Sequence, residues 1–197
     1  MFEFEAFAVL KIKESTIVND CFQNKNNEEV GHYGQTLIIV RKLYNPYRKL
    51  EEYNCFGCSP NNPIGLKMDF YEQGDEVICC WKPTKDYQGY KGVLHGGIQA
   101  TLMDEIASWL VQIKFKTAGV TSKLETKYKK PVIINKGDIL LKAILKETKR
   151  NIAVVNVELF DGENVLCSKS VIQYFMFSKK VAAENLNFPE YGEFFEE

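Results

Sequence analysis

With 197 residues, of which 45% are hydrophobic and 26% charged, the chain has the composition of a globular protein with one main core. Its 25 Lys and Arg residues nearly balance its 26 Asp and Glu residues, and this net charge of -1 gives no general attraction to nucleic acid or a membrane surface. No apolar run approaches the roughly 18 residues of a membrane-spanning helix, and the start is acidic where a secretion signal is basic, so we expect a cytoplasmic protein.

Residues 1–50 contain no pattern that indicates chemistry. The stretch FEFEAFAVLKIK alternates partly like a strand, and QTLIIVRKLY suits a short strand or a helix. We expect an N-terminal extension of unclear role at 1–50, one domain at 51–178 and an acidic C-terminal tail at 179–197.

The first chemical feature is CFGC, residues 55–58. Cysteines with this spacing bind zinc when a second pair or suitable histidines complete the ligand set. Cys79 and Cys80 are adjacent, and the chain has only two histidines, so no further ligands are apparent. A redox role needs a strand–helix context, whereas the following SPNNPIG indicates turns. The sequence therefore favours a packed loop, and we expect neither a metal nor a cofactor.

The rest of the chain predicts two strands, one long helix and four further strands. The first two lie in NNPIGLKMDFYEQGDEVICCWKP around a Gln-Gly-Asp turn, and the helix runs from Gly97 to about Lys114. Four strands follow, in VTSKLETKYKKPV, DILLKAILKETK, IAVVNVELF and VLCSKSVIQYFMF. One helix packed on one antiparallel sheet is an α+β arrangement, and its free edges favour a dimer that extends the sheet.

The predicted helix has an apolar stripe and two acidic residues. Asp104 borders a second face of small residues, whereas Glu105 falls in the polar sector. No basic residue stands three or four positions from Asp104, so its carboxylate is either solvated, paired with another chain or desolvated as a base or nucleophile. The stripe that we expect to pack on the sheet consists of Ile98, Leu102, Ile106, Trp109, Leu110 and Ile113.

Two glycines stand at the start of this helix. The N–H groups of Gly96 and Gly97 are free there and can approach a ligand oxygen closely, although a tight entry into the helix explains the glycines as well. Gly96 and Asp104 are eight residues apart, a rise of about 12 Å, so they can serve one atom only from different subunits. His95 is expected to support the loop.

The stretch GVLHGGIQATLMDEIAS resembles the HGG-motif acyl-CoA thioesterases of the hotdog fold, of the phenylacetate-pathway type. CFGCSPNNPIGLKMDF and GVTSKLETKYKKPV are similar to other segments of that family, so the resemblance spans residues 53–177. It implies a hotdog fold with a long central helix wrapped by a curved antiparallel sheet. It also implies a homodimer or homotetramer that hydrolyses an acyl-CoA at sites between subunits.

The resemblance assigns roles by position. Asp104 is the general base or nucleophile, the Gly96 amide polarises the thioester carbonyl from the other subunit, and Thr121 orients the attacking water, with His95 in support. Lys123, Lys127, Lys129 and Lys130 form a candidate patch for the CoA phosphates, although a solvated strand face explains them as well. The expected substrate contacts are Gly97, Gln88, Ser122 and Lys129.

One position departs from the family pattern. Some members have Asn or Gln six residues before the histidine, where this chain has Gly89, with Gln88 adjacent. The alternative is therefore a non-catalytic acyl-CoA-binding or regulatory protein on the same fold. A hydratase or dehydratase would pair a catalytic histidine with a carboxylate, and His95, the only histidine in the matched region, stands in the thioesterase motif.

Overall fold

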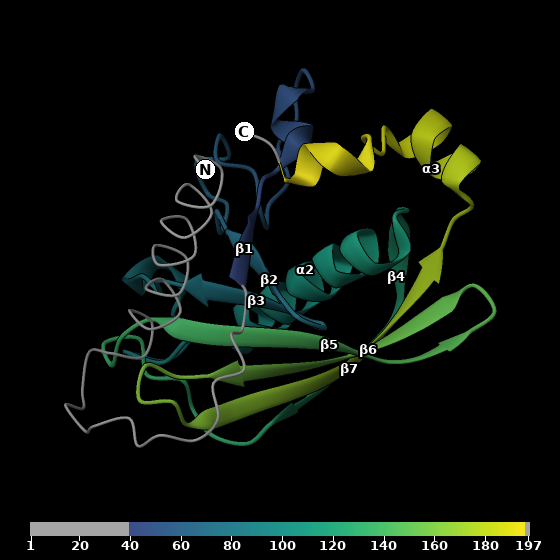
Figure 1. Cartoon of the computed structure of the whole chain (residues 1–197). Helices are drawn as coiled ribbons and strands as arrows, with labels where there is room; N and C mark the ends of the chain where they lie inside the picture. Colours follow the sequence, from purple (N-terminus) through teal and green to yellow (C-terminus); the bar gives the residue numbers. More distant parts are fainter. Residues whose placement is uncertain (1–39, 196–197) are drawn as a thin grey trace, which may run out of the picture.

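The computed structural model describes residues 40–195, in which one antiparallel sheet of seven strands curves around a long helix (Figure 1). The strand order is β1-β2-β3-β5-β6-β7-β4, so β1 and β4 are its edges. The elements are β1 (Val40–Leu43), the 3-10 helix η1 (Pro46–Lys49), β2 (Phe70–Gln73), β3 (Glu76–Trp81), the 3-10 helix η2 (Lys85–Tyr87), α2 (Gly96–Phe115), β4 (Gly119–Tyr128), β5 (Ile139–Lys149), β6 (Ile152–Phe160), β7 (Leu166–Met176), α3 (Lys179–Leu186) and the 3-10 helix η3 (Tyr191–Phe194).

This architecture confirms the predicted fold class, a long helix packed on an antiparallel sheet. The Gln-Gly-Asp turn joins β2 to β3, and Gly74 occupies it with a φ of 59°, a conformation that favours glycine. The four strands after α2 also form where they were predicted. None of the described helices combines the length and apolar character that crossing a bilayer requires.

Helix α2 is covered on two sides. Its predicted stripe is buried apart from Ile98, which is partly buried against the core. On the opposite side Ala107 and Val111 are buried as well. The sheet accounts for one contact surface, and the segments before β2 and after β7 supply others (Figure 1). A helix that is apolar around most of its circumference needs such cover on more than one side.

The polar sector in which Glu105 was predicted is covered by a loop. The Glu105 side chain packs against the CFGC loop, and the Trp109 indole Nε1 donates to Glu105 Oε1 at 3.3 Å. A Cβ placed on Gly57 would lie 2.4 Å from the Glu105 carboxyl group. Helical periodicity identified the surface correctly as polar but carried no information about the loop that folds over it.

The C-terminal segment continues past β7 and passes over the side of α2 that faces away from β5–β7 (Figure 1). Phe194 is fully buried, and Tyr44 N donates to Phe194 O at 2.8 Å next to β1. The expected N-terminal extension falls mainly on residues 1–39, which lie outside the described part of the chain. Residues 40–43 pair with β2 and extend the sheet.

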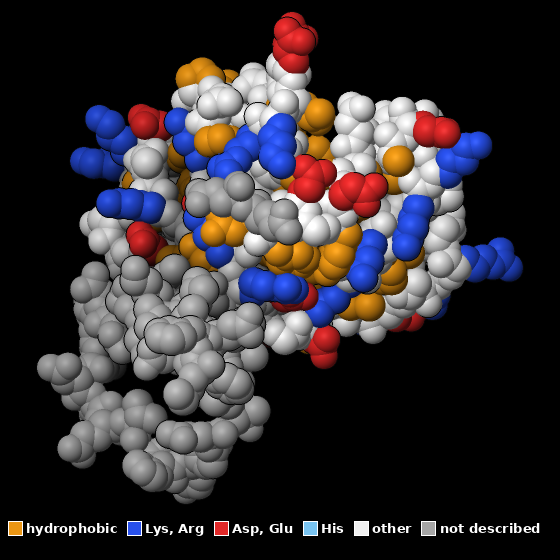
Figure 2. Space-filling model, turned by 45° about the horizontal axis from the view of Figure 1, so that its top comes forward, with side chains coloured by type: hydrophobic (Ala, Val, Ile, Leu, Met, Phe, Trp, Pro, Cys, Tyr) orange, Lys and Arg blue, Asp and Glu red, His pale blue; other side chains and the backbone are white. Residues whose placement is uncertain are grey.

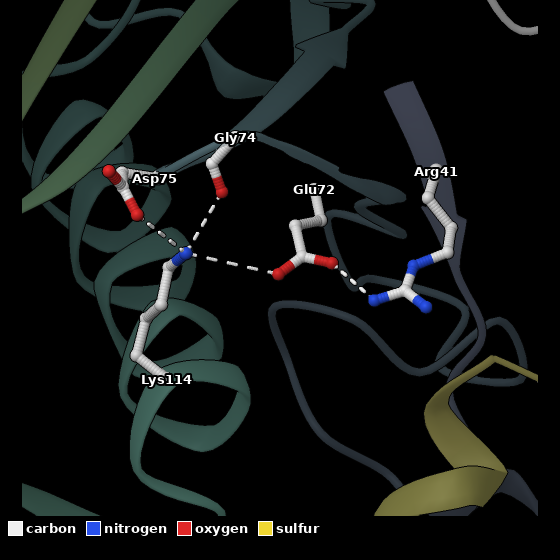
Figure 3. Close-up of polar contacts among 5 residues, drawn as sticks. All are labelled: Arg41, Glu72, Gly74, Asp75 and Lys114. Atoms are coloured by element: carbon white, nitrogen blue, oxygen red, sulfur yellow. Dashed lines mark hydrogen bonds and ion pairs between the residues drawn. The ribbon is translucent and has the colours of Figure 1, made fainter. Parts of the chain in front are cut away.

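Charged side chains connect β1, β2 and the end of α2 (Figure 3). Glu72 contacts Arg41 at 2.5 Å and Lys114 at 3.9 Å. Lys114 Nζ also donates to Gly74 O at 2.9 Å and lies 3.3 Å from Asp75 Oδ1. Surface ion pairs contribute about 1 kcal/mol or less each, so this network adds a modest stabilising contact between the hairpin and the helix.

Candidate functional site

One oxygen of the Asp104 carboxylate accepts hydrogen bonds from two hydroxyl groups. Thr121 Oγ1 donates to Asp104 Oδ1 at 2.8 Å, and the Tyr174 hydroxyl lies 2.7 Å from the same atom. The Tyr174 hydroxyl also lies 2.7 Å from the main-chain oxygen of Asp104, so its single proton is shared between two acceptors. Asp104 Oδ2 has no partner among the described residues. The carboxylate is therefore oriented through Oδ1 and can accept a proton at Oδ2.

A β-bulge determines where the first of these hydroxyls points. The pairing of β4 with β7 shifts register between Thr121 and Lys123, and such a shift re-aims side chains. Ser122 Oγ donates to Gln173 O at 3.0 Å, so this hydroxyl faces β7 and not Asp104. The structure thus brings Thr121 to Asp104 and leaves Ser122 apart.

Sequence reasoning missed Tyr174. Burial and the neighbouring charge of Asp104 raise the pKa of Tyr174 above its ordinary value, so the hydroxyl stays protonated and acts as a donor. The alternation in VLCSKSVIQYFMF gave a signal, because it places Tyr174 on the same face of β7 as Ile172 and Ser170. A buried tyrosine hydroxyl needs a partner, and the unpaired Asp104 was available.

The start of α2 presents a free amide. His95 is its N-cap, and His95 Nδ1 accepts the N–H of Gly97 at 2.9 Å. The Gly97 amide is therefore engaged within the chain. The Gly96 N–H has no acceptor among the described residues and lies at the positive end of the helix dipole. His95 supports the loop in this structure, and Gly96 is the glycine whose amide is open to a ligand.

Side chains that sequence analysis did not single out hold this loop. The Tyr128 hydroxyl donates to Gly96 O at 2.8 Å. Gln99 Nε2 donates to Leu94 O at 3.2 Å, and Gln99 Oε1 accepts the buried Ser168 hydroxyl at 2.7 Å. The polar residue Gln99 among the apolar positions of the predicted helix was the available signal, because a buried amide must find partners.

Gly89, at the position that departs from the family pattern, and its neighbour Gln88 both shape the loop before the helix. Gln88 Oε1 accepts the N–H of Gly92 at 2.9 Å and closes the loop before the helix. A Cβ on Gly89 would lie 3.3 Å from His95 Cδ2, a tight contact. Gly89 therefore lets the imidazole pack directly on the loop, and the Gln88 amide oxygen is already used.

A groove of about 790 Å³ lies beside the free amide. Lys129 and Lys130 stand at its edge, and their main-chain N–H groups donate to Cys167 O at 2.7 and 3.1 Å. Lys123 and Lys127 are exposed on β4 instead, and Lys123 pairs with Glu125 at 2.9 Å. Asp104 is not among the described residues that line the groove, which are Gly89, Tyr90, Val93, Leu94, His95, Gly96, Gln99, Tyr128, Lys129, Lys130 and Pro131.

Sequence comparisons place the chain in a family. The sequence model of the thioesterase superfamily matches residues 91–168, which include the groove loop, α2 and β4. A Saccharolobus solfataricus protein named as an esterase is 32% identical over 112 residues, which cover 56% of this chain and 72% of that protein. This chain belongs to the thioesterase superfamily. An uncharacterised Schizosaccharomyces pombe protein is 34% identical over 79 residues. These residues cover 40% of this chain and 43% of the relative, so the match spans less than half of the relative.

Solved structures agree on the hotdog fold of this superfamily member. A Streptococcus mutans protein crystallised with acetyl CoA has a TM-score of 0.53 and 23% identity, covering 66% of this chain and 98% of its own. A Haemophilus influenzae thioesterase has a TM-score of 0.54 and 22% identity, with 60% and 85% covered. Zebrafish thioesterase superfamily member 2 has a TM-score of 0.52 and 24% identity, with 61% and 88% covered. At these identities the likeness is one of fold.

Proposed function

We propose that the protein hydrolyses an acyl-CoA thioester to a free acid and CoA at a site between two copies of the chain. The observation that carries this proposal is the pair of hydroxyls on Asp104 Oδ1, which orients the carboxylate and leaves Oδ2 free. A merely solvated aspartate would not be expected to gather donors from two neighbouring strands. An oriented carboxylate with one free oxygen is suited to general-base catalysis.

In this reaction Asp104 Oδ2 takes a proton from water while the water oxygen bonds to the thioester carbonyl carbon. The carbonyl oxygen becomes an oxyanion, which the Gly96 N–H at the helix start stabilises. The carbon–sulfur bond then breaks, and the proton held by Asp104 passes to the departing CoA sulfur. Direct attack by Asp104 through an anhydride is the variant route, in which water hydrolyses the anhydride in a second step.

Two chains are needed because the two groups are far apart on one. Gly96 and Asp104 lie on the same helix, about 12 Å apart along its axis. The groove contains Gly96 but not Asp104. An Asp104 supplied by a partner copy, paired through the exposed edge strand β4, would complete the site.

The surface also supports self-association. Figure 2 shows hydrophobic side chains gathered in a strip across one face, with Lys and Arg side chains beside it. Exposed apolar side chains on β4 and β7 include Val120, Val171 and Phe175. Uncovered apolar surface of this kind favours association with another copy.

A CoA ester is the substrate class that fits the groove. Lys129 and Lys130 provide positive charge for phosphates, and the exposed Tyr90 and Tyr128 provide aromatic surface for an adenine ring. The Streptococcus mutans protein of the same fold was crystallised with acetyl CoA, which agrees with this substrate class.

A non-catalytic acyl-CoA-binding protein is the second candidate. It is favoured by one observation, that Gln88 Oε1 is already engaged by Gly92 and Gly89 has no side chain to contact the thioester. Such a protein would bind acyl-CoA in the same groove without releasing thiol.

The deciding experiment is a panel of acyl-CoA esters assayed for free thiol with the full-length protein and its Asp104→Asn variant. We expect turnover in the wild type and a loss of at least about 100-fold in the variant, because a general base contributes about 10²–10⁴. Asp138→Asn, the same change at an exposed position directly before β5, is the matched control and should retain full rate. Acyl-CoA binding by the wild type without thiol release would overturn hydrolysis in favour of the second candidate.

A further inference from the structure

Two thiols and a carboxyl group meet beside α2, next to the residue that contacts Thr121 and Tyr174. Cys55 and Cys58 are free thiols of the CFGC loop, and Glu105 extends toward them from the helix. The two sulfurs and a carboxylate oxygen all lie within 4.8 Å of one another. Cys55 Sγ is 3.7 Å from Glu105 Oε1 and 3.8 Å from Oε2.

We propose that Cys55, Cys58 and Glu105 bind a divalent transition metal ion of the zinc type, with water in the fourth position. Zinc binds thiolate sulfur at about 2.3 Å and carboxylate oxygen at about 2.0 Å in tetrahedral geometry. Ligand atoms in such a tetrahedron are about 3.5–3.8 Å apart. Cys55 Sγ lies at this separation from the Glu105 oxygens, and every pair of ligand atoms in the cluster lies within 4.8 Å. The inference is independent of whether the protein hydrolyses thioesters.

The loop holds one thiolate, at Cys55, beside a protonated thiol, because the hydrogen bond to Cys55, burial and the neighbouring Glu105 charge raise the pKa of Cys58. Hydrogen bonds from the Cys58 side chain, and from the main-chain N–H groups of Cys58 and Gly57, lower the pKa of Cys55 to about 5. A turn in which successive N–H groups point at the first sulfur of a CxxC pair presents both sulfurs on one side. Gly57 leaves room for the Glu105 carboxyl group, because a Cβ would lie 2.4 Å from it.

Further donors surround the cluster without neutralising it. The Tyr53 hydroxyl lies 3.0 Å from Cys58 Sγ, and Asn45 Nδ2 donates to the same sulfur at 3.5 Å. Trp109 Nε1 orients the Glu105 carboxylate. No Lys, Arg or His side chain of the described residues contacts the three ligands. The donors around the cluster are thus neutral among the described residues, and neutral donors of this kind orient ligands around metal ions.

Binding would join two parts of the fold. The CFGC loop precedes β2, and Glu105 lies in the middle of α2, next to Asp104. A metal ion bound by both would fix the loop on the helix and stabilise the folded chain by its binding free energy.

The test measures zinc content on the reduced, full-length chain after loading with Zn²⁺ and desalting. We expect about one zinc per chain, and binding at least tenfold weaker in Cys58→Ser and Glu105→Gln. Two matched controls, Asp104→Asn and Cys167→Ser, should retain wild-type zinc content, because the first changes the adjacent carboxylate and the second a buried cysteine outside the cluster.

A second measurement on the wild type removes dependence on how the variants fold. Zn²⁺ should protect Cys55 and Cys58 from alkylation, as read by peptide mass, and Co²⁺ should give a thiolate-to-metal absorption band. Wild-type zinc far below one per chain with both thiols alkylated would overturn the site. So would full zinc affinity in Glu105→Gln, or a Cys55–Cys58 disulfide whose reduction yields no metal binding.

Discussion

Thr121 Oγ1 lies 2.8 Å from Asp104 Oδ1, and this hydrogen bond joins the edge strand β4 to the middle of α2. The second donor to the same oxygen, Tyr174, is buried, whereas Thr121 is exposed. Tyr174 therefore contributes to core packing, whereas Thr121 does not. Thr121 can be altered with little loss of packing, which allows the orientation of the carboxylate to be tested separately from stability.

Replacing Thr121 with Val removes one donor and leaves Tyr174 in place. A hydrogen bond to a charged group contributes about 1.5–3 kcal/mol, so we expect kcat to fall about tenfold or more. KM and the thermal midpoint should change little, because the side chain is exposed and its volume is conserved. Steady-state thioester hydrolysis measures this, with the exposed Thr148→Val on β5 as control. An unchanged kcat would show that Thr121 does not position the base.

Charge reversal at the groove should affect binding more than chemistry. In Lys129→Glu, the lost attraction to CoA phosphates should raise KM about tenfold, leave kcat within about twofold, and weaken the salt dependence of kcat/KM. Lys146→Glu, an exposed lysine on β5, serves as the comparison. Equal effects of the two substitutions would mean that the groove does not receive the phosphates.

The fold could be predicted because its signals are local. Apolar periodicity predicted α2 to within one residue at each end, and the Gln-Gly-Asp turn located the β2–β3 hairpin. The predictions on the helix itself depended only on 3.6-residue geometry. Where a helix surface was polar, however, the same geometry could not say whether water or a loop covered it, and the contact of Glu105 with the CFGC loop was not predicted for that reason.

The site could be predicted only in part, because its contacts join distant segments. Helix geometry singled out Asp104, and the resemblance to a family assigned its role and added Thr121. Tyr174, 70 residues beyond Asp104, required the sheet order to bring it near. The CFGC loop illustrates the same limit. The sequence favoured a packed loop since no third ligand was apparent, and Glu105 stands 50 residues away from Cys55.

Adding one methyl group at Gly57 should destabilise the protein measurably. The new Cβ would lie 2.4 Å from a carboxyl group that Trp109 and Cys55 hold in place, and such overpacking costs about 1–3 kcal/mol. We expect Gly57→Ala to lower the thermal midpoint by several degrees. Gly192→Ala is the control, because nothing lies within 4 Å of a Cβ there. A midpoint equal to that of Gly192→Ala would contradict the packing of Glu105 on the loop.

The C-terminal segment should contribute to the core through Phe194. This side chain is fully buried, with its ring 5.8 Å from that of Trp109 and 6.3 Å from that of Tyr47, both in edge-to-face contact. Truncation of a buried phenylalanine leaves a cavity and costs about 3–5 kcal/mol, so Phe194→Ala should lower the free energy of unfolding by that amount in urea titrations. Leu186→Ala, 38% exposed on α3, should cost less than about 1 kcal/mol. If both variants unfold at the wild-type urea concentration, the segment after β7 does not pack on α2 in solution.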